Sequence, residues 1–145
     1  MNRIRLTVPD HFSFSTDIRI RITDLNYGGH VGNDTFLALF HEARQLFLLH
    51  HGYGELAFEG VGLIMADAVI EYKLPLSQGD LVRISVTAAD FDKLGFDLFY
   101  VMEKITENGS SLAARCKTGM ICYDYAAQKK VSIPVAAIAR LSKDH

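Results

Sequence analysis

Several features that would point to a particular class of protein are missing from this sequence of 145 residues. No stretch approaches the roughly 18 uninterrupted apolar residues of a membrane span. Arg3, Arg5 and Asp10 interrupt the N-terminal apolar run that a signal peptide would need. Fifteen lysines and arginines against 17 aspartates and glutamates give a net charge of −2, which offers no broad attraction to nucleic acid or anionic lipid. We therefore expect a cytoplasmic protein with no nucleic-acid partner and no membrane partner.

Cysteine is scarce as well: only Cys116 and Cys122 are present. They lie six residues apart in what reads as one extended strand, so their Cα atoms should stand roughly 20 Å apart, too far for a disulfide. Neither belongs to a Cys-x-x-Cys or Cys/His spacing, so we expect no metal site on them. Both are interpreted as small apolar fillers of the core.

What is present is an ordinary globular composition, with 49% hydrophobic and 22% charged residues. The chain shows no internal repeat, low-complexity segment or linker, and its length suits one hydrophobic core. We expect a single domain over residues 1–145.

One segment has the period of a helix. Residues 35–51 contain no glycine or proline and are apolar on most faces. Asn33 and Asp34 precede the segment as candidate caps, and Gly52 follows it as a candidate terminator. A narrow polar strip remains, made of His41, Glu42, Arg44 and Gln45. The pattern predicts a helix about 26 Å long that the rest of the protein encloses.

The remaining apolar segments alternate with a period of two, which is typical of strands. We expect one strand before the helix, within residues 12–22, and four after it in hairpin succession, at 64–74, 82–88, 96–102 and 112–125. A sheet of this size must bury one face, and the helix is the only element able to cover it. The prediction is an α+β fold in which a five-stranded antiparallel sheet wraps around one long central helix. Residues 129–145 are expected to form a loosely packed end.

A glycine-rich turn joins the first strand to the helix. Gly28, Gly29 and Gly32 fall within five residues immediately before the helix. Such a turn lets a ligand approach the backbone and leaves amide donors free. It suits a group that gains negative charge, such as a carbonyl that becomes an oxyanion.

This turn resembles a known signature. Residues 24–33 read Asp-Leu-Asn-Tyr-Gly-Gly-His-Val-Gly-Asn, and residues 41–44 read His-Glu-Ala-Arg. The string is similar to the Asp-x-Asp-x-x-Gly-His-Val-Asn-Asn and Glu-x-Ala-Arg of hotdog-fold acyl-CoA thioesterases, in the 4-hydroxybenzoyl-CoA thioesterase-like family. The resemblance extends over about residues 12–125. It implies a hotdog fold, hydrolysis of an acyl-CoA or acyl-carrier thioester, and an active site between two subunits. We expect coenzyme A only as part of the substrate, no other cofactor and no metal.

The resemblance also implies a mechanism in which the amide of Asn33 or Asp34 polarises the thioester carbonyl and a carboxylate acts as nucleophile or general base. The family's usual carboxylate, the second Asp of its pair, is Asn26 in this chain, and an amide cannot act as a base. Other branches of the fold place the carboxylate about two helical turns further on. Eight residues after Asp34 is Glu42, and eight after Asn33 is His41.

The candidate residues follow from this reading. Glu42 and Asp34 are the candidate catalytic carboxylates. Glu42 is a candidate because burial in the helix would raise its pKa. Asn26 is a candidate for holding a water molecule or the thioester carbonyl. Asp24 reads as a cap, Asp67 as a weaker ligand candidate, and Arg44 as a structural residue that pairs at an interface. His50 and His51 are interpreted as favouring the negative end of the helix dipole. The predicted substrate-binding residues are Tyr27, Gly29, His30, Gly32 and Asn33.

Two alternatives to hydrolysis stay open: a non-catalytic module that binds acyl thioesters, which Asn26 favours, and a hotdog-fold hydratase or dehydratase. An open sheet edge, together with the family's shared site, favours a homodimer. Whether dimers pair again into a homotetramer is left open.

Overall fold

The computed structural model describes residues 1–143, and its longest element is the helix α1 (Asn33–His50). Gly32 occupies the N-cap position, and no side chain caps the helix. Asn33 and Asp34 are therefore the first helical residues, and the prediction that they cap it from outside was wrong. The predicted end is confirmed, because Gly52 follows the helix with a φ of +83°, a left-handed conformation that favours glycine.

One face of α1 packs on the sheet. Its buried side chains include Phe36, Leu39, Phe40 and Phe47, which form much of the core. Arg44, expected in the polar strip, is buried as well. The opposite face, with Leu37, His41, Glu42, Gln45 and Leu49, is exposed. In the single chain the helix is thus covered on one face only and is not enclosed as predicted.

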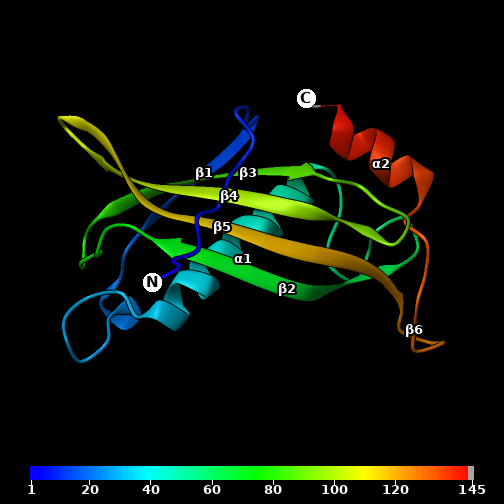
Figure 1. The fold of residues 1–145 in the computed structure, drawn as a ribbon, viewed down its shortest axis with the longest axis horizontal. Helices are drawn as coiled ribbons and strands as arrows, with labels where there is room; N and C mark the ends of the chain where they lie inside the picture. Colours follow the sequence, from blue (N-terminus) through cyan, green and yellow to red (C-terminus); the bar gives the residue numbers. More distant parts are fainter. Residues whose placement is uncertain (144–145) are drawn as a thin grey trace.

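The strands form one antiparallel sheet that curves around α1 (Figure 1). They are β1 (Phe14–Arg19), β2 (Gly62–Tyr72), β3 (Leu81–Ala89), β4 (Gly95–Thr106), β5 (Gly109–Asp124) and the short β6 (Lys129–Lys130). Their order is β1-β3-β4-β5-β2, and β6 pairs with β5. The five predicted strands and the α+β class are confirmed, and β6 is a two-residue addition.

The hairpin succession holds for β3, β4 and β5 but is wrong for β2, which pairs with β5 at the far edge of the sheet. The connection from β2 to β3 is too long for a tight hairpin and carries the chain past the start of α1. There Leu76 is fully buried, and its carbonyl accepts a hydrogen bond from the amide of Val31 at 2.9 Å. This crossing ties the β2 exit to the glycine turn.

A β-bulge changes which side chains of β2 face the helix. The register with β5 shifts between Met65 and Asp67, so one extra residue lies on β2. Ile64 was predicted to share a face with Ile70. Because the bulge inverts the alternation between them, the two face opposite sides of the sheet.

Residues 129–143 are better ordered than the sequence suggested. After β6 the chain forms the helix α2 (Val135–Ser142), in which Ala137 and Leu141 are buried. These apolar contacts fix the segment on the domain, so the expected loose end was wrong for its described part. Asp144 and His145, the last residues of the predicted single domain, lie outside the described residues.

The outer face of the sheet, opposite α1, carries the N-terminal segment, which crosses it before β1 begins (Figure 1). Cys116 and Cys122 are both in β5, buried and free, as predicted. Within residues 1–143, no helix combines the length and apolar character needed to cross a membrane.

Candidate active site at the start of the long helix

The approach to α1 begins with a short 3-10 turn, η1 (Ile22–Asp24). Asp24 is buried and accepts a hydrogen bond from the backbone amide of Arg21 at 2.8 Å. Its other oxygen pairs with the Arg21 guanidinium at 3.3 Å. Asp24 therefore caps this turn, as the sequence indicated, and both of its oxygens are engaged there.

Asn26 organises the glycine turn from inside. Its side-chain oxygen accepts hydrogen bonds from the amides of Gly28 at 2.9 Å and His30 at 3.5 Å. Its backbone carbonyl accepts from the amide of Gly29, which has a φ of +81°. The acceptor oxygen that could have held water or a carbonyl is thus engaged within the loop.

Beyond this turn the chain leaves a set of unpaired amides. Those of Gly28, Gly29, His30 and Val31 all donate within the chain. The amides of residues 33–35, in the first turn of α1, have no acceptor among residues 1–143. These donors point out of the helix at its positive end, where an anion or a developing oxyanion is stabilised.

One predicted carboxylate lies beside these amides. A Cβ atom added to Gly32 would stand 2.7 Å from Oδ1 of Asp34, so the Asp34 side chain folds back over the N-cap. Asn33 and Asp34 are both exposed, which leaves this corner open to a ligand. The structure therefore places the Asp34 carboxylate beside the N-cap residue Gly32, next to the amide donors at the start of α1.

Tyr72 is a residue of this corner that the sequence reading did not propose. Its hydroxyl donates a hydrogen bond to the carbonyl of Asn33 at 2.9 Å, and its ring packs edge-on against Phe36. Burial raises the pKa of Tyr72, and the negative charge of Asp34 adds to the shift. The strand alternation already placed Tyr72 on the helix-facing side, but the pattern does not predict its contact with Asn33, which lies 39 residues away along the chain.

The other predicted carboxylate, Glu42, is not in this corner. Glu42 lies eight residues further along α1, about 12 Å from Asp34 at the helical rise. It is exposed and lines a shallow hollow with Ala38, His41 and Gln45, so the expectation that it is buried was wrong. His30 and Tyr27 are exposed at the tip of the turn.

Asp67 has structural partners. It accepts hydrogen bonds at 2.8 Å from both the Lys117 ammonium and the amide of Gly119. The Lys117 hydrogen bond holds the pKa of Asp67 below its usual range. Asp67 therefore joins β2 to β5, and its oxygen is engaged there rather than with a ligand.

Arg44 pairs with Glu55 of the same chain at 2.7 Å rather than with a residue across an interface. His50, in the last turn of α1, packs against the ring of Phe14. The adjacent His51, at the C-cap, contacts Phe47. These three residues lie away from the open start of the helix, and their contacts are structural.

Comparison with known proteins gives a consistent result. The family model described as the thioesterase-like superfamily matches residues 20–141. The acyl-CoA thioester hydrolase YbgC of Escherichia coli is 22% identical over 132 residues, which cover 90% of this chain and 96% of that protein.

Solved structures of similar fold include Slr0204, a 1,4-dihydroxy-2-naphthoyl-CoA thioesterase from Synechocystis. It has a TM-score of 0.80 and 21% identity over 91% of this chain and 98% of that chain. The 4-hydroxybenzoyl CoA thioesterase from Pseudomonas sp. strain CBS-3 has a TM-score of 0.78 and 15% identity, over 90% of this chain and 99% of that chain.

Proposed function

The chain belongs to the thioesterase-like superfamily and has its hotdog fold, and from this we propose that it hydrolyses acyl-CoA thioesters at the start of α1. The single observation that supports this site is the set of unpaired amides at residues 33–35, with the Asp34 carboxylate beside them. The similarity to an acyl-CoA thioester hydrolase over nine-tenths of the chain supports the same reaction.

The chemistry needs two contributions from the protein. The thioester carbonyl oxygen would accept hydrogen bonds from the amides at the start of α1, which stabilise the charge that develops on it. Asp34 would take a proton from a water molecule whose oxygen attacks the carbonyl carbon. The carbon–sulfur bond then breaks, the thiolate leaves and takes up the proton, and the products are the free acid and coenzyme A.

Asp34 fits the role of base better than Glu42 within one chain. Glu42 is about 12 Å further along the helix, too far to share one thioester carbonyl with the amides of its own α1. It could take part only if a second copy brought its exposed helix face to this corner. Glu42 is therefore assigned to the alternative in which two subunits complete the site.

A second copy is also expected on other grounds. β2 is an eleven-residue strand at an edge of the sheet, and its residues 65–68 are exposed. A long unpaired edge favours pairing with another chain, and a two-fold axis would join β2 to the same strand of the partner. We accordingly propose a homodimer. We also propose a cytoplasmic location, which is supported by the two cysteines of the chain, because both are free and buried.

The test is hydrolysis of a panel of thioesters, from acetyl-CoA to palmitoyl-CoA and benzoyl-CoA, followed by a reagent that detects free thiol. We expect the wild-type protein to release thiol. Asp34→Asn should lower kcat by about 100-fold or more, because general-base catalysis contributes roughly 10²–10⁴-fold. The control is Glu42→Gln, which also replaces a carboxylate of α1 with an amide. Its kcat should stay within about tenfold of the wild-type value.

Saturable binding of acyl-CoA without release of thiol would contradict hydrolysis and support the binding module. Loss of activity in Glu42→Gln but not in Asp34→Asn would move the base to Glu42. Thermal unfolding of both variants shows whether a loss of rate reflects chemistry or folding.

A further inference from the structure

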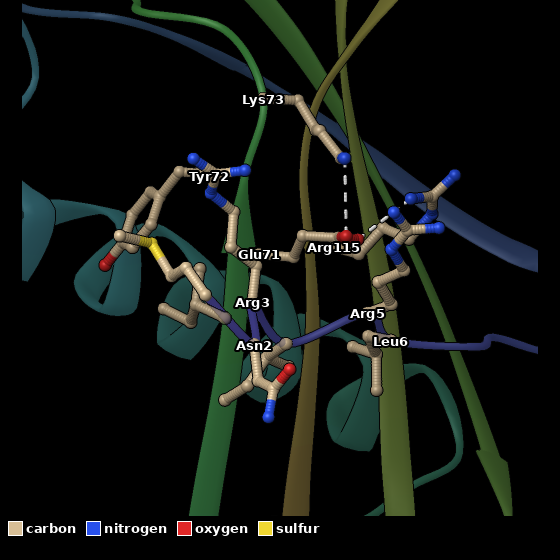
Figure 2. Close-up of a pocket in the computed structure, with 11 residues that line it drawn as sticks. Asn2, Arg3, Arg5, Leu6, Glu71, Tyr72, Lys73 and Arg115 are labelled. Carbon is tan, nitrogen blue, oxygen red and sulfur yellow. Dashed lines mark hydrogen bonds and ion pairs between the residues drawn. The ribbon is translucent and has the colours of Figure 1, made fainter.

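A second cavity lies on the outer face of the sheet, where the N-terminal segment crosses β2 and β5 (Figure 2). Its volume is about 1170 Å³. Small-molecule sites commonly measure roughly 300–1,000 Å³, so the cavity can hold a ligand as large as a nucleotide. Its lining comes from residues 1–6 on one side and from Ile70, Glu71, Tyr72, Lys73 and Arg115 on the other.

The cavity concentrates positive charge in a chain whose net charge is −2. Arg3, Arg5, Lys73 and Arg115 line it, against the single carboxylate of Glu71. Four cationic side chains and one carboxylate leave a local excess of three positive side-chain charges. An excess of this kind in one concave site raises the local concentration of anions.

Glu71 does not neutralise the site, because it is shared between two of the cations. It accepts a hydrogen bond from Arg115 at 2.9 Å and pairs with Lys73 at 3.3 Å. The Arg115 hydrogen bond holds the pKa of Glu71 below its usual range, so the carboxylate stays ionised and keeps these two side chains in place.

Arg3 and Arg5 have no such partner. Neither forms an ion pair with any carboxylate of the described chain, and both are exposed. Figure 2 shows the Arg3 side chain extending toward Tyr72, and the Arg5 guanidinium beside that of Arg115. The Arg115 guanidinium is already paired with Glu71, whereas the Arg5 guanidinium has no carboxylate partner, and a bound anion would supply one.

We propose that this cavity binds the phosphates of the coenzyme A nucleotide, with Arg3 and Arg5 as the residues that contact them. The inference rests on the proposed function and makes coenzyme A, rather than a carrier protein, the thiol carrier. The nucleotide of coenzyme A has a diphosphate and a separate 3′-phosphate, and guanidinium groups bind phosphate oxygens in pairs.

Tyr72 connects this cavity to the proposed active site. It lines the cavity, and its hydroxyl also bonds to the carbonyl of Asn33 in the first turn of α1. A ligand that passes the end of β2 at Tyr72 would reach from the arginines on the outer face to the open amides. The pantetheine arm, which separates the nucleotide from the thioester, has the extended form that this path requires.

The first measurement is calorimetric titration with adenosine 3′,5′-bisphosphate, which has phosphates of the nucleotide but no pantetheine arm and no thioester. We expect saturable binding to the wild-type protein and about 10- to 100-fold weaker binding to the double variant Arg3→Ala/Arg5→Ala, because hydrogen bonds between charged groups are lost. The control is Lys129→Ala/Lys130→Ala, which also removes two exposed cations but at β6, and its affinity should stay within about twofold.

The second measurement compares an acyl-CoA with the matching acyl-N-acetylcysteamine thioester, which lacks the nucleotide. Arg3→Ala/Arg5→Ala should raise KM for the acyl-CoA about tenfold or more and leave kcat/KM for the short thioester unchanged. If the double variant had the same KM for the acyl-CoA as the wild-type protein, the inference would be overturned.

The outcomes also separate the inference from the proposed function. Binding of the bisphosphate that depends on the two arginines, without hydrolysis of any thioester, keeps the inference and removes the function. Hydrolysis without such binding keeps the function and removes the inference. The inference would also be overturned if the protein preferred an acyl-carrier protein to acyl-CoA, and if the double substitution slowed only the reaction with the carrier protein.

Discussion

At the scale of single residues, Asn26 differs from the aspartate of the thioesterase signature in what one side-chain atom can do. The side-chain oxygen of Asn26 accepts hydrogen bonds from the amides of Gly28 and His30, and a carboxylate oxygen could accept the same two hydrogen bonds. A second carboxylate oxygen would remain for chemistry, whereas Asn26 has an NH2 group there, which can only donate. The substitution therefore keeps the turn and removes the base.

This separation of roles gives a prediction for Asn26. Asn26→Ala removes the acceptor, so the free energy of unfolding should fall by about 1 kcal/mol. Asn26→Asp keeps the acceptor and should change that free energy by less than about 0.5 kcal/mol. Urea unfolding followed by circular dichroism measures both. An equal loss in the two variants would show that the side-chain oxygen does not hold the turn.

Residues close in sequence could be predicted for the site, and the residue far away could not. Gly32, Asn33 and Asp34 lie together because they are consecutive at a helix start, which glycine spacing and helical period indicate. Tyr72 reaches the same corner from 39 residues away along the chain. Its approach depends on the register of β2 and on the path of the connection through Leu76, and neither is encoded locally.

At the scale of elements, a polar cluster inside the core joins α1 to the sheet. Arg44 of α1 is 6% exposed and donates to Glu55 at 2.7 Å and to the hydroxyl of Tyr100 on β4 at 3.3 Å. The Tyr100 hydroxyl also shares a hydrogen bond of 2.7 Å with Thr118 on β5. Burial raises the pKa of Tyr100 to about 12, so the hydroxyl keeps its proton and the cluster links helix to sheet.

The cluster predicts an asymmetry between its two charged members. Glu55→Ala leaves the Arg44 guanidinium buried without its carboxylate, so the free energy of unfolding should fall by about 2–4 kcal/mol. Arg44→Met replaces the charge with an apolar side chain of similar length and should cost less, about 1–2 kcal/mol. Chemical denaturation of both variants checks this order. A larger loss for Arg44→Met would indicate that the pair itself stabilises the fold.

Elements could be predicted from the sequence where a period defines them. The alternation over residues 82–88 of β3 and 96–102 of β4 placed their buried side chains correctly, because each of these stretches keeps one face on the core. It failed on β2, where the bulge after Met65 inverts the faces. It failed also on the order of strands, because alternation shows which face of a strand is buried and not which strand lies beside it.

At the scale of the whole molecule, the features that stay open in one chain lie near each other. The edge of β2 is unpaired, the start of α1 is exposed, and the basic cavity adjoins the end of the same strand at Tyr72. A second chain paired along β2 would cover the edge, and it would border both the candidate active site and the path from the cavity. Dimerisation and substrate binding are therefore expected to be linked through β2.

The edge of β2 gives the last prediction. Ala68 is exposed near the middle of this strand, and a charge pointing inward from an edge strand opposes pairing with another chain. Ala68→Lys should therefore convert a dimer, of twice the 16.2 kDa of one chain, into a monomer in sedimentation velocity. Ser15→Lys adds the same charge to β1 at the opposite edge and should leave the dimer intact. If Ser15→Lys alone dissociates it, the interface lies along β1, and the start of α1 must act without a partner beside β2.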